Sequence, residues 1–201
     1  MPVSPPDVSA FILAGGKSTR MGSDKALVTL DDRTLLARAL DLASSVTPNV
    51  HIVGDPAKFA SFAPVVQDIF QNCGPLAGIH AALRSSPTDL NLILAVDVPF
   101  ISTAFLEYLI ERACRNPAVV TIAQTAEGYQ PLSAIYCRQF ADLADTALRA
   151  GRYKIDSLFP STNTQIITEE ELKAAGFSAT MFRNLNTQEE LAKASEITKS
   201  H

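Results

Sequence analysis

Short apolar runs alternate with segments of helical periodicity along most of this 201-residue chain. The apolar runs are too short for most helices and are typical of buried strands. Strands are therefore expected at residues 8–13, 50–53, 64–67, 91–96, 118–123, 131–136 and 164–167. Between them, helices are expected over 34–45, from Pro75, after Ser102, up to Gly151, from Thr168 to near Gly176 and after Thr187. The last two are expected to start at capping boxes, formed by Thr168 with Glu171 and by Thr187 with Glu190.

This alternation predicts one α/β domain over residues 1–201, with a loose, proline-containing leader at 1–7. The strands at 8–13 and 50–53 enclose a helix, which implies parallel pairing and a right-handed crossover. The run at 91–96 is the most apolar and is expected at the centre of the sheet. We expect a Rossmann-like three-layer sandwich with a mostly parallel sheet. Because the later strands are less regularly interleaved with helices, the sheet is expected to be mixed.

Two glycines directly follow the first expected strand, and three cations follow within ten residues. Gly15 and Gly16 allow bare backbone to approach a ligand, and Lys17, Arg20 and Lys25 supply positive charge. Backbone N–H groups supported by cations form a site for a polyphosphate. The alternative is an ordinary strand–turn–helix connection with solvated cations, but so many features in one connection favour phosphate binding.

Two familiar phosphate-binding loops are excluded at this position. A Walker A loop would require glycine where Phe11 stands, and the chain contains no G-x-G-x-x-G motif. The loop therefore belongs to a third kind.

A carboxylate follows the most apolar strand directly. Asp97 lies where open α/β sheets bind ligands, at the carboxyl end of a buried strand. It could instead satisfy local backbone donors, but Ser102 is better placed to cap the next helix. Carboxylate oxygens suit Mg²⁺, which commonly bridges to substrate phosphates, so we favour Asp97 as a magnesium ligand.

The composition restricts the classes of partner and compartment. A formal charge of −4 gives no reason to expect nucleic acid as a partner. The three cysteines form no C-x-x-C pair, which argues against a disulfide framework or a structural zinc site. No apolar stretch approaches the roughly 20 residues of a membrane span, and the N-terminus does not resemble a secretory signal. We therefore expect a cytoplasmic protein that does not bind membranes.

Four motifs carry a resemblance to a known family. The stretch from Leu13 to Leu27 reads L-A-G-G-K-S-x-R-M-G-x-D-K-A-L, and G-P-L-A-G, D-x-P-F and F-x-N-x-N-T-x-E-E-L follow later. These motifs resemble those of the molybdenum cofactor guanylyltransferases, within the nucleotide-diphospho-sugar transferase type of fold. The resemblance runs from about Phe11 to Leu191, nearly the whole chain.

The resemblance implies Mg²⁺-dependent transfer of GMP from GTP to molybdopterin-bound molybdenum cofactor, with release of pyrophosphate. Arg20 and Lys25 would hold phosphates, and Asp97 would hold the metal. Proteins of cofactor synthesis and molybdoenzymes are the candidate protein partners. The resemblance further implies that the nucleotide is bound by residues of the first loop and of three later segments: Leu13, Ala14, Gly15, Gly16, Lys25, Asp68, Gly78 and Asp97.

Several of these residues could instead have a purely structural role or be solvated. Asp68 could be a turn residue, and Gly78 could serve simple helix–strand packing. Asn186 is a candidate second metal ligand, although Asn184 and Asn186 could merely shape a turn. A segment Q-P-L-x-A-x-Y at 130–136 resembles the family's acceptor half, and Arg152 and Lys154 could bind an acceptor phosphate or remain solvated.

One position departs from the family pattern. Many of the guanylyltransferases have asparagine at the end of the strand where this chain has Gly54. This keeps open a cytidylyl- or sugar-phosphate nucleotidyltransferase of the same fold. A catalytically silent nucleotide- or cofactor-binding module is the alternative outside enzymes.

Overall fold

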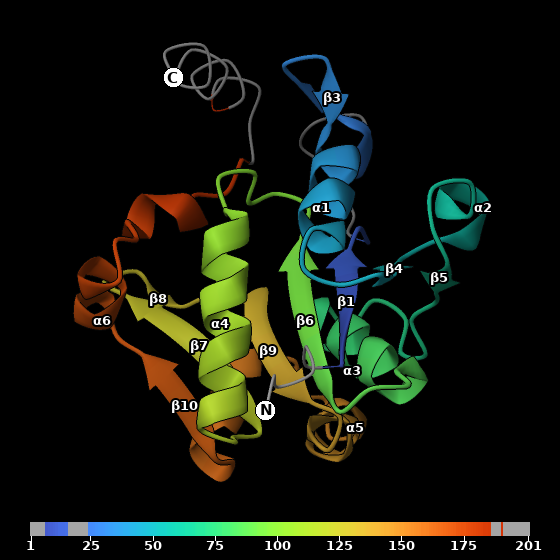
Figure 1. Cartoon of the computed structure of the whole chain (residues 1–201). Coiled ribbons are helices and arrows are strands. Elements are labelled where there is room, and N and C mark those ends of the chain that lie inside the picture. Colours follow the sequence, from blue (N-terminus) through green and yellow to red (C-terminus); the bar gives the residue numbers. More distant parts are fainter. Residues whose placement is uncertain (1–6, 16–23, 186–189, 191–201) are drawn as a thin grey trace.

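The computed structural model describes residues 7–15, 24–185 and 190 (Figure 1). The main sheet has eight strands. They are β1 (Val8–Leu13), β4 (Asn49–Val53), β5 (Val65–Val66), β6 (Leu90–Ala95), β7 (Val120–Thr125), β8 (Gly128–Tyr129), β9 (Ser133–Cys137) and β10 (Thr164–Ile167). Their order is β10-β7-β9-β6-β1-β4-β5, with β8 paired to β7.

The sheet is mostly parallel, as predicted, and β9 accounts for most of its mixed character. β1 is parallel to both β4 and β6, β5 is parallel to β4, and β10 is parallel to β7. β9 is antiparallel to both of its neighbours, β6 and β7. The predicted parallel unit of the first two strands is therefore confirmed, and β6 lies inside the sheet between β1 and β9.

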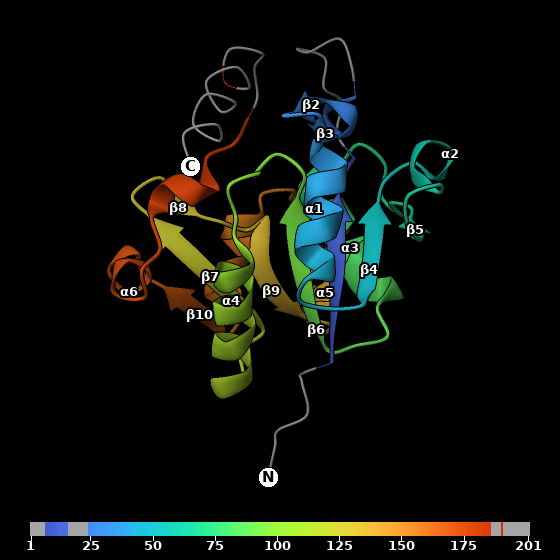
Figure 2. The same ribbon diagram turned by 45° about the horizontal axis from the view of Figure 1, so that its top comes forward.

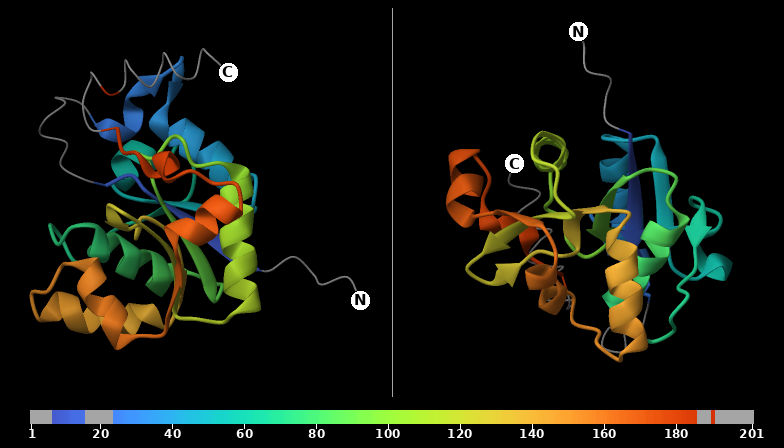
Figure 3. Two further views of the ribbon diagram at one scale, coloured as in Figure 1. Left: turned by 90° about the vertical axis from the view of Figure 1, so that its left-hand side faces the viewer. Right: turned by 90° about the horizontal axis from the view of Figure 1, so that it is seen from below.

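Helices cover both faces of the sheet. They are α1 (Leu35–Ser44), α2 (Pro56–Phe59), α3 (Pro75–Ser85), α4 (Thr103–Arg115), α5 (Phe140–Arg149) and α6 (Glu169–Ala174). Short 3-10 turns are η1 (Lys25–Leu27), η2 (Ile155–Ser161) and η3 (Ala179–Phe182). Figure 3 shows α1 and α4 on one side and α3 and α5 on the other, which confirms the three-layer sandwich.

The two faces of the sheet correspond to two separate apolar cores. Ile12 and Leu94 belong to the core under α1 and α4, whereas Phe11 and Ile93 belong to the core under α3 and α5. Because successive strand residues point to opposite faces, a strand buried on both sides must be apolar throughout. This explains why β1 and β6 are apolar except for Ser9 and Asn91, whose buried side chains are hydrogen-bonded to Thr88.

Capping residues and a glycine lie at several helix ends. Thr34 and Ser102 accept backbone hydrogen bonds as N-caps of α1 and α4. Thr168 and Glu171 form the predicted capping box of α6. Gly151 has a φ of 71°, a conformation that glycine adopts without strain just after α5. The capping box predicted at Thr187 lies outside the described residues.

Two small elements were not anticipated. β2 (Thr29–Leu30) and β3 (Arg33–Thr34) form a hairpin whose two turn residues, Asp31 and Asp32, both have positive φ. This is the geometry of a two-residue hairpin turn, which tolerates aspartate less well than glycine and was therefore hard to predict. Figure 2 shows the hairpin beyond the N-terminal end of α1. Asp55 caps the short helix α2, where the sequence indicated only the end of a strand.

None of the helices among the described residues is both long and apolar enough to cross a membrane.

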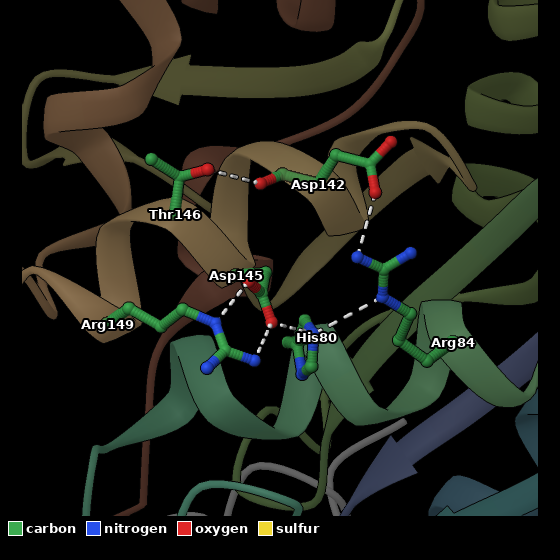
Figure 4. Close-up of polar contacts among 6 residues, drawn as sticks. All are labelled: His80, Arg84, Asp142, Asp145, Thr146 and Arg149. Atoms are coloured by element: carbon green, nitrogen blue, oxygen red, sulfur yellow. Dashed lines mark hydrogen bonds and ion pairs between the residues drawn. The ribbon is translucent and has the colours of Figure 1, made fainter.

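α3 and α5 pack against each other through a cluster of charged side chains around the buried His80 (Figure 4). His80 Nε2 lies 3.5 Å from Asp145 Oδ1, and Arg84 and Arg149 form ion pairs with Asp142 and Asp145. The Arg84–Asp142 pair joins the end of α3 to the start of α5, and the His80–Asp145 contact joins their middles, so the two helices are antiparallel. Burial lowers the pKa of His80, and the neighbouring Arg84 lowers it further.

We expect the free energy of unfolding to decrease as the pH falls below the ordinary histidine pKa of about 6.5. Burial also lowers the pKa of His51, so the unfolded chain binds more protons than the folded chain in this range. Urea unfolding as a function of pH should show a shallower acid dependence in His80→Gln than in the wild type. His51→Gln is the matched comparison. An unchanged slope in both variants would contradict the prediction.

Candidate active site

The first loop and Asp97 lie at the same edge of the sheet. β1 and β6 are parallel neighbours in which Leu13 pairs with Ala95, and both strands point the same way in Figure 1. Gly15 and Asp97 therefore follow these strands at their common carboxyl edge. This is the edge at which open α/β sheets bind ligands.

The predicted phosphate-binding lysine and the predicted metal-binding aspartate contact each other directly. Lys25 Nζ lies 2.7 Å from Asp97 Oδ2. Lys25 begins η1, whose N-cap Asp24 accepts a hydrogen bond from the amide of Ala26. Lys25 and Asp97 are 72 positions apart in the sequence and form an ion pair whose two side chains are mostly shielded from solvent.

Asp68 and Gly78 lie together at a second corner of this edge. A Cβ atom at Gly78 would lie 3.2 Å from Leu13 Cδ2, 3.5 Å from Val53 Cγ1 and 3.6 Å from Asp68 Oδ1. The close approach expected at Gly78 is therefore made by side chains of β1 and β4 and by Asp68. The helix–strand packing explanation accounts for this glycine, and its contact with a base stays a prediction.

Asp68 carries an oxygen that needs a donor. Oδ1 is buried and has no hydrogen-bond partner among the described residues. Burial also raises the pKa of the Asp68 carboxyl. Buried acceptors are nearly always satisfied, so this oxygen is suited to accept from a ligand that presents N–H groups.

One amide of the predicted cradle is hydrogen-bonded within the sheet. The amide of Ala14 donates to the carbonyl of Val53 at 3.0 Å, so it is used by the sheet. Gly16 and Arg20 lie outside the described residues, as does Asn186. The neighbour of that asparagine, Leu185, donates its amide to the carbonyl of Asp97 at 2.9 Å, while Asn184 is exposed.

The segment predicted for the acceptor half also reaches this edge. Because β9 runs antiparallel to β6, its first residues lie beside the last residues of β6. The amide of Ala95 donates to the carbonyl of Leu132 at 2.9 Å. Tyr136 is fully buried, and its hydroxyl donates to the carbonyl of Pro131, so this tyrosine stabilises the segment from within the core.

Arg152 and Lys154 are exposed just after α5. The antiparallel packing of α3 and α5 brings this turn towards the start of α3. A hydrogen bond with Cys73 raises the pKa of Tyr153, which shows that the turn contacts the loop before α3. This contact joins segments far apart in the chain, and no short-range pattern marked it.

A single carboxylate such as Asp97 is compatible with the way in which magnesium is commonly bound. The described residues contain no cluster of three or more histidine, cysteine, aspartate or glutamate side chains that could hold a metal. Magnesium is commonly bound by only one or two carboxylates, with substrate phosphates and water completing its coordination. In this structure the carboxylate of Asp97 is paired with the ammonium of Lys25.

Comparison with known proteins agrees with this geometry. Residues 10–164 match the MobA-like NTP transferase domain. A molybdenum cofactor guanylyltransferase of Desulfosudis oleivorans is 34% identical over 196 residues, which cover 96% of each chain. The chain belongs to the molybdenum cofactor guanylyltransferase family. A second guanylyltransferase, from Syntrophotalea carbinolica, is 30% identical over 92% of this chain and 89% of its own.

Solved structures extend the agreement to the fold. Molybdopterin-guanine dinucleotide biosynthesis protein A from Archaeoglobus fulgidus superposes with a TM-score of 0.83 and 26% identity, covering 96% of this chain and 100% of that one. A 4-diphosphocytidyl-2C-methyl-D-erythritol synthase from Anaerococcus prevotii has a TM-score of 0.71 at 16% identity, which shows the shared fold alone. The guanylyltransferase family member described here is therefore a nucleotidyltransferase with the predicted type of fold.

Phe59 was missed in the sequence, and it explains the departure at Gly54. A Cβ atom at Gly54 would lie 2.9 Å from Phe59 Cδ2, and Phe59 is buried. The same Cβ would lie 3.7 Å from the amide nitrogen of Gly15, so the two glycine backbones are close. An asparagine at position 54 would therefore collide with a core side chain. The sequence signal for this contact was weak. Asp55 and Pro56 are typical of a helix start, and Phe59 follows them within one helical turn.

Replacing Gly54 with alanine should lower the free energy of unfolding by about 1–3 kcal/mol, because the added methyl group overpacks the site against Phe59. Gly15→Ala is the matched control: among the described residues its Cβ would meet nothing closer than 3.9 Å. The control should change stability by no more than about 0.5 kcal/mol. In a Phe59→Leu background the cost of Gly54→Ala should shrink, as urea unfolding can measure. Equal costs in both backgrounds would contradict the proposed contact.

Proposed function

We propose that the protein transfers GMP from GTP to the terminal phosphate of a molybdopterin-bound molybdenum cofactor, releasing pyrophosphate, with Mg²⁺ as cofactor. The observation that carries this proposal is the meeting of Lys25 and Asp97 at the carboxyl edge of the sheet, beside Gly15. The guanine and molybdopterin specificity follows the relatives, which are named molybdenum cofactor guanylyltransferases.

The charges of the reactants explain why a cation and a carboxylate are needed together. An anionic phosphate attacks the α-phosphorus of a polyanion, so repulsion and the charge of the leaving group must both be neutralised. A magnesium ion held by Asp97 would supply Lewis-acid neutralisation of phosphate oxygens. Lys25, and Arg20 outside the described residues, would hold phosphates and stabilise the departing pyrophosphate.

The reaction requires no general base, since the attacking phosphate is already ionised. The described histidines agree with this. His80 belongs to the α3–α5 cluster, and the ring of His51 stacks on Phe11 with centroids 5.1 Å apart.

Recognition of the base is assigned to the corner around Asp68 and Gly78. The buried Oδ1 of Asp68 could accept from the N1–H and N2–H₂ donors of guanine, whereas cytosine presents its N4–H₂ donor beside the acceptor N3. This assignment replaces the side-chain contact that Gly54 cannot supply.

Guanine selectivity predicts different behaviour with three nucleotides. In the presence of Mg²⁺, GTP should raise the melting temperature more than CTP or UTP. At about 100 times the dissociation constant, the stabilisation amounts to about 2.7 kcal/mol. Pyrophosphate release with a molybdopterin acceptor should also favour GTP. Equal use of all three nucleotides would refute the guanylyl assignment, and a preference for CTP would favour the cytidylyl alternative.

Replacing Asp97 with asparagine should lower kcat/KM by about a hundredfold or more, because the charge that holds the metal is removed. Glu111→Gln is a control, since Glu111 forms an exposed pair with Arg115 that should contribute little. Steady-state kinetics on both variants, with melting curves to verify folding, measures the effect. A fully active Asp97→Asn variant would favour a catalytically silent binding module.

A further inference from the structure

The contact between Lys25 and Asp97 is more shielded than the other lysine ion pairs of the described residues. The Lys25 and Asp97 side chains are 18% and 21% exposed. Lys58, paired with Asp24, is 53% exposed, and Lys173, paired with Glu169, is 64% exposed. Shielding strengthens the attraction between charges and makes removal of one partner costly, whereas exposed pairs contribute little.

The same carboxylate is the proposed metal ligand. A divalent cation that bound Asp97 through Oδ2 would lie close to the Lys25 ammonium, because Nζ and Oδ2 are in hydrogen-bond contact. Two positive charges at one carboxylate oxygen repel each other. The ammonium of Lys25 therefore competes with a metal ion at this oxygen.

We propose that Lys25 is an internal cation that holds Asp97 until a nucleoside triphosphate attracts its ammonium onto the phosphates. Phosphate binding by Lys25 then frees Asp97 to bind the divalent cation. Nucleotide and metal consequently bind cooperatively, and the protein without nucleotide binds the metal weakly. This inference rests on the proposed function, in which Asp97 is the metal ligand.

The local structure allows the lysine side chain to move while its backbone stays in place. Asp24 accepts from the amide of Ala26 and from Nζ of Lys58, the latter at 2.8 Å. Ala26 is fully buried. The chain on both sides of Lys25 is therefore anchored, and the flexible four-carbon stem can redirect the ammonium without opening the loop.

Binding of Mn²⁺ to the nucleotide-free protein tests the competition directly. Isothermal titration should show weak binding by the wild type, and binding about tenfold tighter or more by Lys25→Met, the scale of one charge-assisted hydrogen bond. Lys25→Met/Asp97→Asn should lose this gain, because the gain depends on the released carboxylate. The Mn²⁺-induced rise in melting temperature provides a second readout.

Lys58→Met is the matched control for a general change of charge. Lys58 is paired with Asp24, next to Lys25 in sequence, and is not assigned to substrate. It should leave Mn²⁺ affinity close to that of the wild type. A similar gain in both lysine variants, or no gain in Lys25→Met, would overturn the proposal.

These outcomes are separable from the proposed function. Loss of turnover in Asp97→Asn without any Mn²⁺ gain in Lys25→Met would refute the competition and leave the guanylyl transfer standing. A Mn²⁺ gain in Lys25→Met together with turnover that does not prefer GTP would support the competition and refute the guanine assignment.

Discussion

The structure depends on the parallel pairing of β1 with β6. This pairing aligns Leu13 with Ala95, so two loops that are far apart in the chain leave the sheet at one edge. An antiparallel arrangement would have sent them to opposite edges, and Lys25 could not have reached Asp97. The apolar residues that secure the pairing lie in both cores, which ties the position of the site to the burial of the whole sheet.

Most of the fold could be predicted because its signals are local. Apolar runs marked β1 and β10 at their observed bounds, helical periodicity marked α1, and capping residues marked the starts of α4 and α6. The reversed direction of β9 could not be read from its residues, since a strand carries no local mark of its direction. The β2–β3 hairpin was missed because two aspartates occupy turn positions that usually favour glycine or asparagine.

The site was only partly predictable. Lys25 and Asp97 were found because each follows a recognisable strand, and the structure brings them into contact. The use of the Ala14 amide by Val53 and the filling of space by Phe59 depend on packing between distant segments. Such contacts have no fixed spacing in the chain. The roles of all the site residues stay predictions, and Gly16, Arg20 and Asn186 also lie outside the described residues.

The contact of Phe59 with the backbone at Gly54 has a consequence for how this corner can evolve. A lineage that acquired a polar side chain at position 54 first would have to tolerate a strained core in the interval. One that first reduced the ring at position 59 would carry a cavity instead. Either order of substitution passes through a less stable protein. Residues 54 and 59 are therefore expected to change together.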